Sequence, residues 1–188
     1  MNKRIYLTGL GITVTLLSVL PIDNMPAIAR LVNVGTEIAD NILRQPKVNL
    51  NLVAQQKQIK KDAQGKEVVS WKVLDEKTLV KPGDIIRFTV TGRNEGNKTA
   101  KDVAFTQKIA KGTVYSLNSA TSSGATITYS IDQGKTFVAN PIVKVTLANG
   151  KVEERPAPAE AYTHLRWNFN QELAPNAEIQ ATYLAKVR

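Results

Sequence analysis

Residues 82–97 have the sequence PGDIIRFTVTGRNEGN, in which polar and apolar side chains alternate between two turn signals. Ile86, Phe88 and Val90 fall on one face of an extended chain, and the residues between them are polar. The flanking segments Pro-Gly-Asp and Asn-Glu-Gly-Asn are rich in residues that favour turns. The stretch therefore predicts a β-strand with one face against a core and the other face in water.

The same alternation continues upstream of this strand. Residues 48–54 alternate with a period of two, and residues 69–73 do so again after the turn cluster Asp-Ala-Gln-Gly at 62–65. Two alternating runs that are joined by a short turn are typical of a β-hairpin. We therefore expect a hairpin in the first part of the β-rich region.

Downstream, further strands are expected from residue 103 to the turn at 111–112, and at residues 127–131, 143–147, 165–169 and 179–187. Asn149-Gly150 is a strong hairpin-turn signal. We expect loops at 119–124, which is rich in Ser, Thr and Gly, and at 153–161, which contains two prolines. The whole pattern gives about eight or nine short strands and predicts an all-β antiparallel sandwich.

Three of the predicted strands supply the residues that we expect to share one core. Their apolar positions all fall on the inward side of the alternation. These residues are Ile86, Phe88, Val90, Leu165, Trp167, Phe169, Ile179, Ala181 and Tyr183.

The composition restricts the chemistry that the chain can perform. Its 188 residues include 25 Lys and Arg, 16 Asp and Glu, one His and no Cys, with a formal net charge of +9. Without cysteine there is no disulfide, no thiolate metal site and no cysteine nucleophile. The single histidine, His164, is expected beside Arg166 on a solvated strand face rather than as a general base. We expect a protein without catalytic residues, metal or cofactor, and not an enzyme.

The N-terminal segment 1–29 has the features of a cleaved signal peptide. Lys3 and Arg4 precede an apolar run at 5–20, and Ala27-Ile28-Ala29 fits the small-x-small cleavage pattern. The alternative is an uncleaved N-terminal anchor. Both interpretations place the domain outside the cytoplasm, in the periplasm, on the cell surface or in the medium.

The remaining chain divides into two predicted parts. Residues 30–46 carry apolar side chains at helical spacing and end at a proline, so we expect a short helix there. Residues 47–188 form the expected β-sandwich domain.

Several segments resemble the bacterial repeat catalogued as domain of unknown function eleven. The matching segments, in chain order, are Val80–Asp84, Phe88–Thr91, Asn94–Gly96, Ile109–Thr113, Tyr129–Phe137, His164–Trp167 and Leu173–Ala177. The chain departs from the pattern at Ile109 and Ala110, where the family has Leu and Pro, and at Asn176, where Gly is common. The resemblance implies an immunoglobulin-like sandwich in an exported or surface protein, with no catalytic residues to carry over.

The hairpin region is strongly basic, since residues 47–81 contain eight lysines and four acidic residues, a net charge of +4. We identify Lys57, Lys60 and Lys61 as candidate contacts to an anionic surface. The turn at 62–65 would let all three form one patch. The alternative is that the lysines keep an edge strand soluble.

The sequence favours a non-enzymatic module of the cell envelope, or a secreted one, with a structural or adhesive role. The alternative is a binding module for an anionic glycan or a membrane surface. Envelope polysaccharide, membrane surface and another surface protein are the candidate partners, and nucleic acid is not expected because aromatic residues do not alternate with the lysines. The sequence leaves the oligomeric state open.

Overall fold

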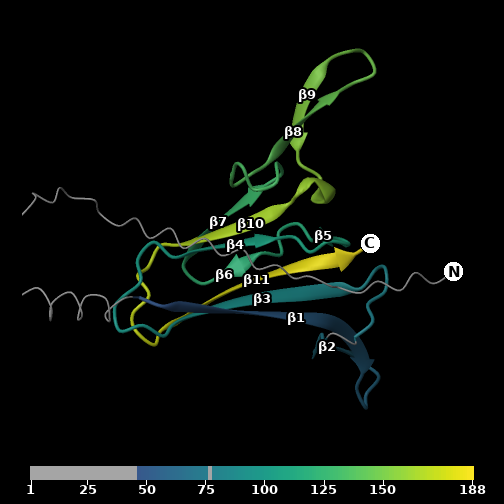
Figure 1. The fold of residues 1–188 in the computed structure, drawn as a ribbon. Coiled ribbons are helices and arrows are strands. Elements are labelled where there is room, and N and C mark those ends of the chain that lie inside the picture. The colour runs from purple at the N-terminus through teal and green to yellow at the C-terminus, as the bar shows by residue number, and fades with distance from the viewer. Residues whose placement is uncertain (1–45, 76–77) are drawn as a thin grey trace, which may run out of the picture.

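The computed structural model describes residues 46–75 and 78–188 (Figure 1). The signal peptide predicted at 1–29 and all but the last residue of the helix predicted at 30–46 lie outside these ranges. The described chain is all-β, with one short 3₁₀ helix, η1 (Ala159–Ala161), and every strand pairing is antiparallel. The predicted fold class is therefore confirmed.

The larger sheet has six strands in the order β2-β1-β3-β11-β5, with β6 also paired to β11. Its strands are β1 (Val48–Lys61), β2 (Glu67–Val73), β3 (Ile85–Asn94), β5 (Thr113–Tyr115), β6 (Thr121–Ser122) and β11 (Glu178–Val187). The strand predicted from residues 82–97 is β3, which lies at the centre of this sheet between β1 and β11.

The second sheet has three strands in the order β4-β10-β7. They are β4 (Ala104–Lys108), β10 (His164–Phe169) and β7 (Ala125–Ser130). A separate two-stranded hairpin consists of β8 (Ile142–Thr146) and β9 (Val152–Pro156).

All nine residues predicted to share a core are buried, with at most 6% of their surface exposed. They belong to one hydrophobic cluster that joins the two sheets. Phe88 stacks on Tyr183 with ring centroids 4.9 Å apart, and Trp167 from the smaller sheet lies 6.1 Å from the same tyrosine. The predicted core and its register are confirmed.

Two segments predicted as loops contain strands. Residues 119–124 include β6, where Ser122 Oγ donates to the Gln180 carbonyl at 2.9 Å. Residues 153–161 include most of β9, which pairs with β8 because the turn at Gly150, with φ of +79°, reverses the chain. A proline is tolerated at the end of β9, since β9 is an edge strand with one paired side.

Asn94 ends β3 and is fully buried, although its sequence context suggested only a turn. Its side-chain amide donates to the carbonyls of Lys98 at 2.7 Å and Leu173 at 2.9 Å. Its side-chain oxygen accepts from the backbone N–H groups of Lys47 and Gly96, each at 3.1 Å. One buried amide therefore fixes the start of β1 and the turn after β3.

Candidate binding surface on the projecting hairpins

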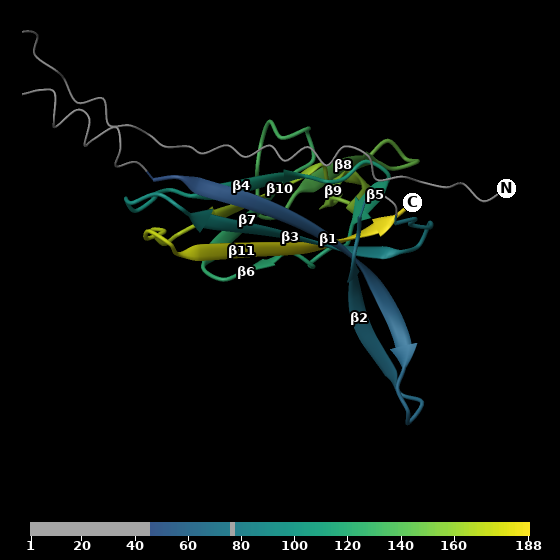
Figure 2. The ribbon, with the colours of Figure 1, turned by 60° about the horizontal axis from the view of Figure 1, so that its bottom comes forward.

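The hairpin of β1 and β2 extends beyond the sandwich because β1 changes partners along its length. β1 pairs with β3 from Val48 to Gln56 and with β2 from Gln55 to Lys61. Beyond Gln56, β2 is the only strand in the described ranges that pairs with it, and Figure 2 shows this end bending away from the sheets. We call residues 57–72 the β1–β2 arm.

The structure places the three candidate lysines on two faces of this arm. β1 remains a strand through Lys61, and side chains alternate along it, so Lys57 and Lys61 share one face and Lys60 lies on the other. All three are exposed. The turn begins only at Asp62, whose carbonyl accepts from the Gly65 N–H at 3.0 Å. The three lysines therefore do not form a single patch.

The face that carries Lys57 and Lys61 also has an exposed apolar strip. Ile59 on β1 lies opposite Val69 on β2, and Val73 follows on the same face. These three side chains are 57%, 49% and 57% exposed, respectively. No second layer from the described part of the chain covers the arm, and the alternation in the sequence did not reveal this exposure. The sequence signal that could have indicated the exposed strip lies on β1, where Ile59 stands between Lys57 and Lys61 on the same face.

Trp71, opposite Lys57, anchors the base of the strip to the sandwich. The Arg87 guanidinium lies 4.2 Å from the centre of the Trp71 ring, in cation–π geometry. The same guanidinium donates two hydrogen bonds to Gln55 Oε1, at 3.0 and 2.7 Å. These contacts fix the direction in which the arm leaves β3.

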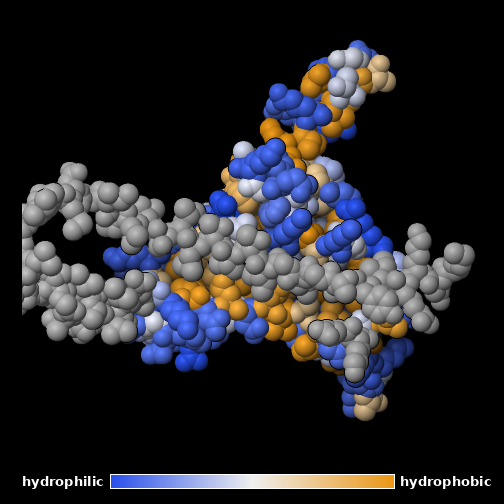
Figure 3. All heavy atoms as spheres, viewed as in Figure 1, coloured by the Kyte–Doolittle hydropathy of each residue, from blue (hydrophilic) through white to orange (hydrophobic). Residues whose placement is uncertain are grey.

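The β8–β9 hairpin, residues 142–156, is a second arm that projects at the top of Figure 1. Ile142 and Val152 lie on one of its faces and are 52% and 56% exposed. Figure 3 shows hydrophobic residues along this hairpin beside hydrophilic ones. Exposed β-branched side chains are thus common to both arms.

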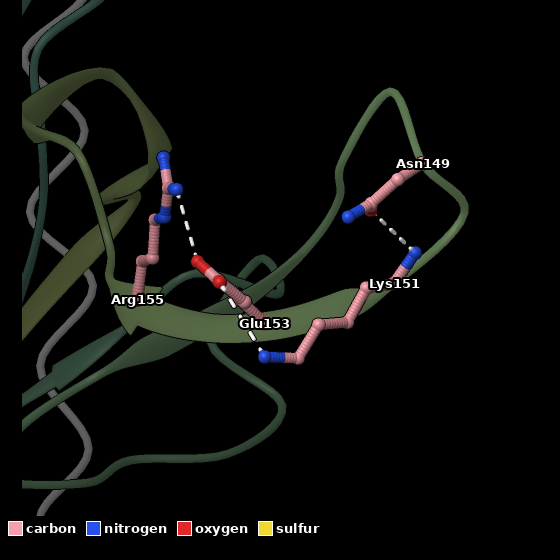
Figure 4. A network of polar contacts seen from close by, with 4 residues as sticks. All are labelled: Asn149, Lys151, Glu153 and Arg155. Atoms are coloured by element: carbon pink, nitrogen blue, oxygen red, sulfur yellow. Dashed lines mark hydrogen bonds and ion pairs between the residues drawn. The ribbon is translucent and has the colours of Figure 1, made fainter.

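The two arms differ in how their charges are paired. On the β8–β9 arm, Glu153 binds Arg155 at 3.0 Å and Lys151 at 4.0 Å (Figure 4). Lys144 and Glu154 form a further pair at 4.0 Å. The β1–β2 arm has five lysines and two acidic residues, a net charge of +3, and its lysines form no ion pair with any residue in the described ranges. The β8–β9 arm has three cationic and two acidic residues, a net charge of +1, so the β1–β2 arm presents the larger uncompensated positive charge.

His164 lies on the outer face of β10, as predicted, with its ring packed against Gly134. Its Nδ1 is 3.1 Å from Thr163 Oγ1. Burial, together with nearby Lys108 and Arg166, lowers the pKa of this histidine below its usual value. Burial and the neighbouring cations both disfavour the charged imidazolium form.

Asp132 organises the turn that follows β7. Its carboxylate accepts hydrogen bonds from Thr136 Oγ1 at 2.6 Å, Ser130 Oγ at 2.7 Å and the backbone N–H groups of Lys135 and Thr136. The Thr136 hydroxyl and N–H, followed by the Ser130 hydroxyl, hold the pKa of this carboxyl below its usual range. These hydrogen bonds show that the Asp132 carboxylate stabilises the turn after β7.

Within the described residues, no three His, Asp or Glu side chains gather closely enough to hold a metal ion. No helix in the described ranges has the length and hydropathy needed to cross a membrane. Comparisons with family models, curated proteins and solved structures give no match to this chain.

Proposed function

We propose that this chain is a non-enzymatic, exported β-sandwich module of the cell envelope or the medium, with a structural or adhesive role. The observation that carries the proposal is the pair of hairpin arms, which expose β-branched side chains away from a well-packed core. Monomeric proteins rarely leave such residues grouped in water without a partner. The proposal includes export through the signal peptide and membership of the repeat family that the sequence resembles.

Shortening the arms tests this function. Gln56 and Lys72 lie directly opposite each other, so an Asn-Gly turn can replace residues 57–71 without disturbing the β1–β3 pairing. The same turn can join Val143 to Arg155 on the other arm, because these two residues also face each other as a hydrogen-bonded pair. We expect both shortened proteins to fold, and at least one to lose binding to envelope fragments from the source cells. Undiminished binding by a protein that lacks both arms would refute the proposal.

The unpaired lysines favour a second, more specific function, which is binding of the β1–β2 arm to an anionic glycan or lipid surface. Each lysine near an anionic membrane is worth about 1 kcal/mol. Because Lys57 and Lys61 share a face and Lys60 does not, two of them can approach a flat surface together. Their joint removal should therefore weaken binding roughly thirtyfold.

Cosedimentation with vesicles rich in phosphatidylserine, and with an acidic polysaccharide, tests this second function. The double variant Lys57→Gln and Lys61→Gln should lose more binding than Lys60→Gln. Lys111→Gln with Lys186→Gln is the matched control, since both residues are exposed and lie off the arm. Wild-type binding should fall as salt rises. Equal losses in the two double variants would argue against the arm as the contact.

A further inference from the structure

The outer edge of β2 offers unpaired backbone groups. Leu74 N–H donates to the Ala54 carbonyl at 2.8 Å, and Asp62 N–H donates to the Lys66 carbonyl at 2.9 Å. Hydrogen-bonded pairs alternate along an antiparallel ladder, so the even-numbered residues of β2 bond to β1 and the odd-numbered ones direct their N–H and C=O groups outward. The outward-directed residues are Glu67, Val69, Trp71 and Val73. No other strand in the described ranges pairs with this edge.

The two edges of the arm are protected to different degrees. On the β1 edge, residues 57–61 include three lysines, which is a usual device against edge-to-edge pairing. The edge strand β2 has seven residues, of which only Glu67 and Lys72 are charged. The lysines therefore protect β1, as the solubility interpretation expects, and leave β2 available.

We propose that β2 is a self-association edge, at which the β2 strands of two copies pair antiparallel about a two-fold axis through Ser70. In this register all seven residues of β2 find a partner. Val69 lies opposite Trp71 of the second copy, an aromatic and β-branched combination that stabilises sheets. Glu67 lies opposite Val73, and Val68 opposite Lys72, so no like charges face each other.

Neighbouring registers are less favourable. A register shifted by one residue sets outward groups against inward ones and cannot form the ladder. Centring the axis on Val69 places Lys66 opposite Lys72 of the second copy. Centring it on Trp71 places Glu67 opposite Asp75. Like charges directly opposite each other destabilise a sheet, which selects the register centred on Ser70.

Pairing about Ser70 joins the apolar strips of the two arms. Ile59, Val69 and Trp71 of each copy then lie on one continuous face of a four-stranded ribbon. Each arm carries a net charge of +3, so salt should strengthen the pairing by screening the repulsion between the arms. Salt has the opposite effect on binding to an anionic surface, and the pairing needs no such surface. Failure of one proposal is therefore distinguishable from failure of the other.

A single cysteine at the axis tests the register, because the chain has none of its own. The two copies of residue 70 form a non-hydrogen-bonded pair with Cα atoms about 4.5 Å apart. That spacing suits a disulfide. The full chain with Ser70→Cys should therefore give a covalent dimer under mild oxidation, seen on a non-reducing gel.

Val68→Cys is the matched control, since it lies on the same face of the same strand. In the proposed register the two copies of residue 68 are roughly 14 Å apart along the strands, too far for a disulfide. The control should stay monomeric on the gel. Equal crosslinking of both variants, or no dimer with Ser70→Cys, would overturn the proposal.

A second measurement uses charge and needs no crosslink. Val73 faces the neutral Gln55 within its own copy and Glu67 of the second copy across the axis. In sedimentation velocity at matched concentration and moderate salt, Val73→Lys should associate several-fold more strongly than Val73→Glu. Net charge alone predicts the reverse order, because the arm is basic. The reverse order, or no difference, would contradict the proposed register.

Discussion

At the residue scale, Gly92 on β3 lies directly against the Phe105 ring of the smaller sheet. A Cβ atom on this residue would lie 2.5 Å from Phe105 Cζ and 3.0 Å from Leu50 Cδ2. We predict that Gly92→Ala lowers the free energy of unfolding by about 1–3 kcal/mol through overpacking, measured by urea denaturation. Phe105→Leu should recover part of the loss in the double variant. Additive losses in this double-mutant cycle would show that the ring is not the cause.

Asp132 supplies a pH-dependent contribution at the same scale. Its pKa is lower in the folded state than in the unfolded chain, so its stabilisation is fully present above the ordinary carboxyl pKa of about 4 and is lost as pH falls toward the folded value. We predict that Asp132→Asn is less stable than wild type at neutral pH, and that the difference shrinks in acid. Urea unfolding at several pH values measures it.

The Thr136 hydroxyl is the largest cause of the lowered pKa of Asp132. Thr136→Val should therefore raise this pKa and produce part of the same change in the pH profile. A stability difference between wild type and Asp132→Asn that stays constant from neutral pH into acid would contradict this role.

At the element scale, the two arms are hairpins that no other sheet of residues 46–75 and 78–188 covers. Isolated two-stranded hairpins are marginally stable in water, and local opening is easiest where few apolar contacts are buried. At low protein concentration we predict fast amide hydrogen exchange in residues 58–72 and 143–155 and slow exchange in β3 and β11. Mass spectrometry of peptic fragments measures this contrast. Protection of the arms equal to that of β3 would contradict it.

The alternation in the sequence was sufficient to predict β3, β10 and β11, because each places apolar side chains on one face over a shared core. It missed β9, where the charged residues at 153–155 and the closing proline conceal an edge strand that β8 pairs by backbone bonds. The alternation also did not predict that β1 pairs with two strands, β3 along its first part and β2 along its last part. Pairing and exposure depend on the tertiary arrangement, which the pattern of a single strand does not contain.

The candidate site was predictable only in part for a similar reason. Lysine content identified the β1–β2 hairpin as the charged element, and Lys57, Lys60 and Lys61 are exposed on it. Their distribution over two faces followed from how far β1 extends, which the turn residues alone did not determine. The apolar strip beside them became visible only when Val69 and Val73 were found to lack a covering sheet.

At the scale of the whole molecule, the proposed function divides the chain into a scaffold, which is the sandwich, and interaction elements, which are the arms. One buried cluster holds the two sheets together, whereas both arms extend past it (Figures 1 and 2). A change in either arm should therefore affect binding far more than it affects global stability. A change in a core residue should instead affect global stability far more than it affects binding.

Hydrogen exchange of the full chain with and without envelope fragments compares these two parts of the molecule in one experiment. The fast baseline exchange expected in the arms makes any protection there easy to detect. We predict that envelope fragments slow exchange in residues 58–72, in 143–155, or in both, and leave β3, β10 and β11 unchanged. Protection that appears on the strands of the sandwich and not on the arms would contradict the division into scaffold and interaction elements.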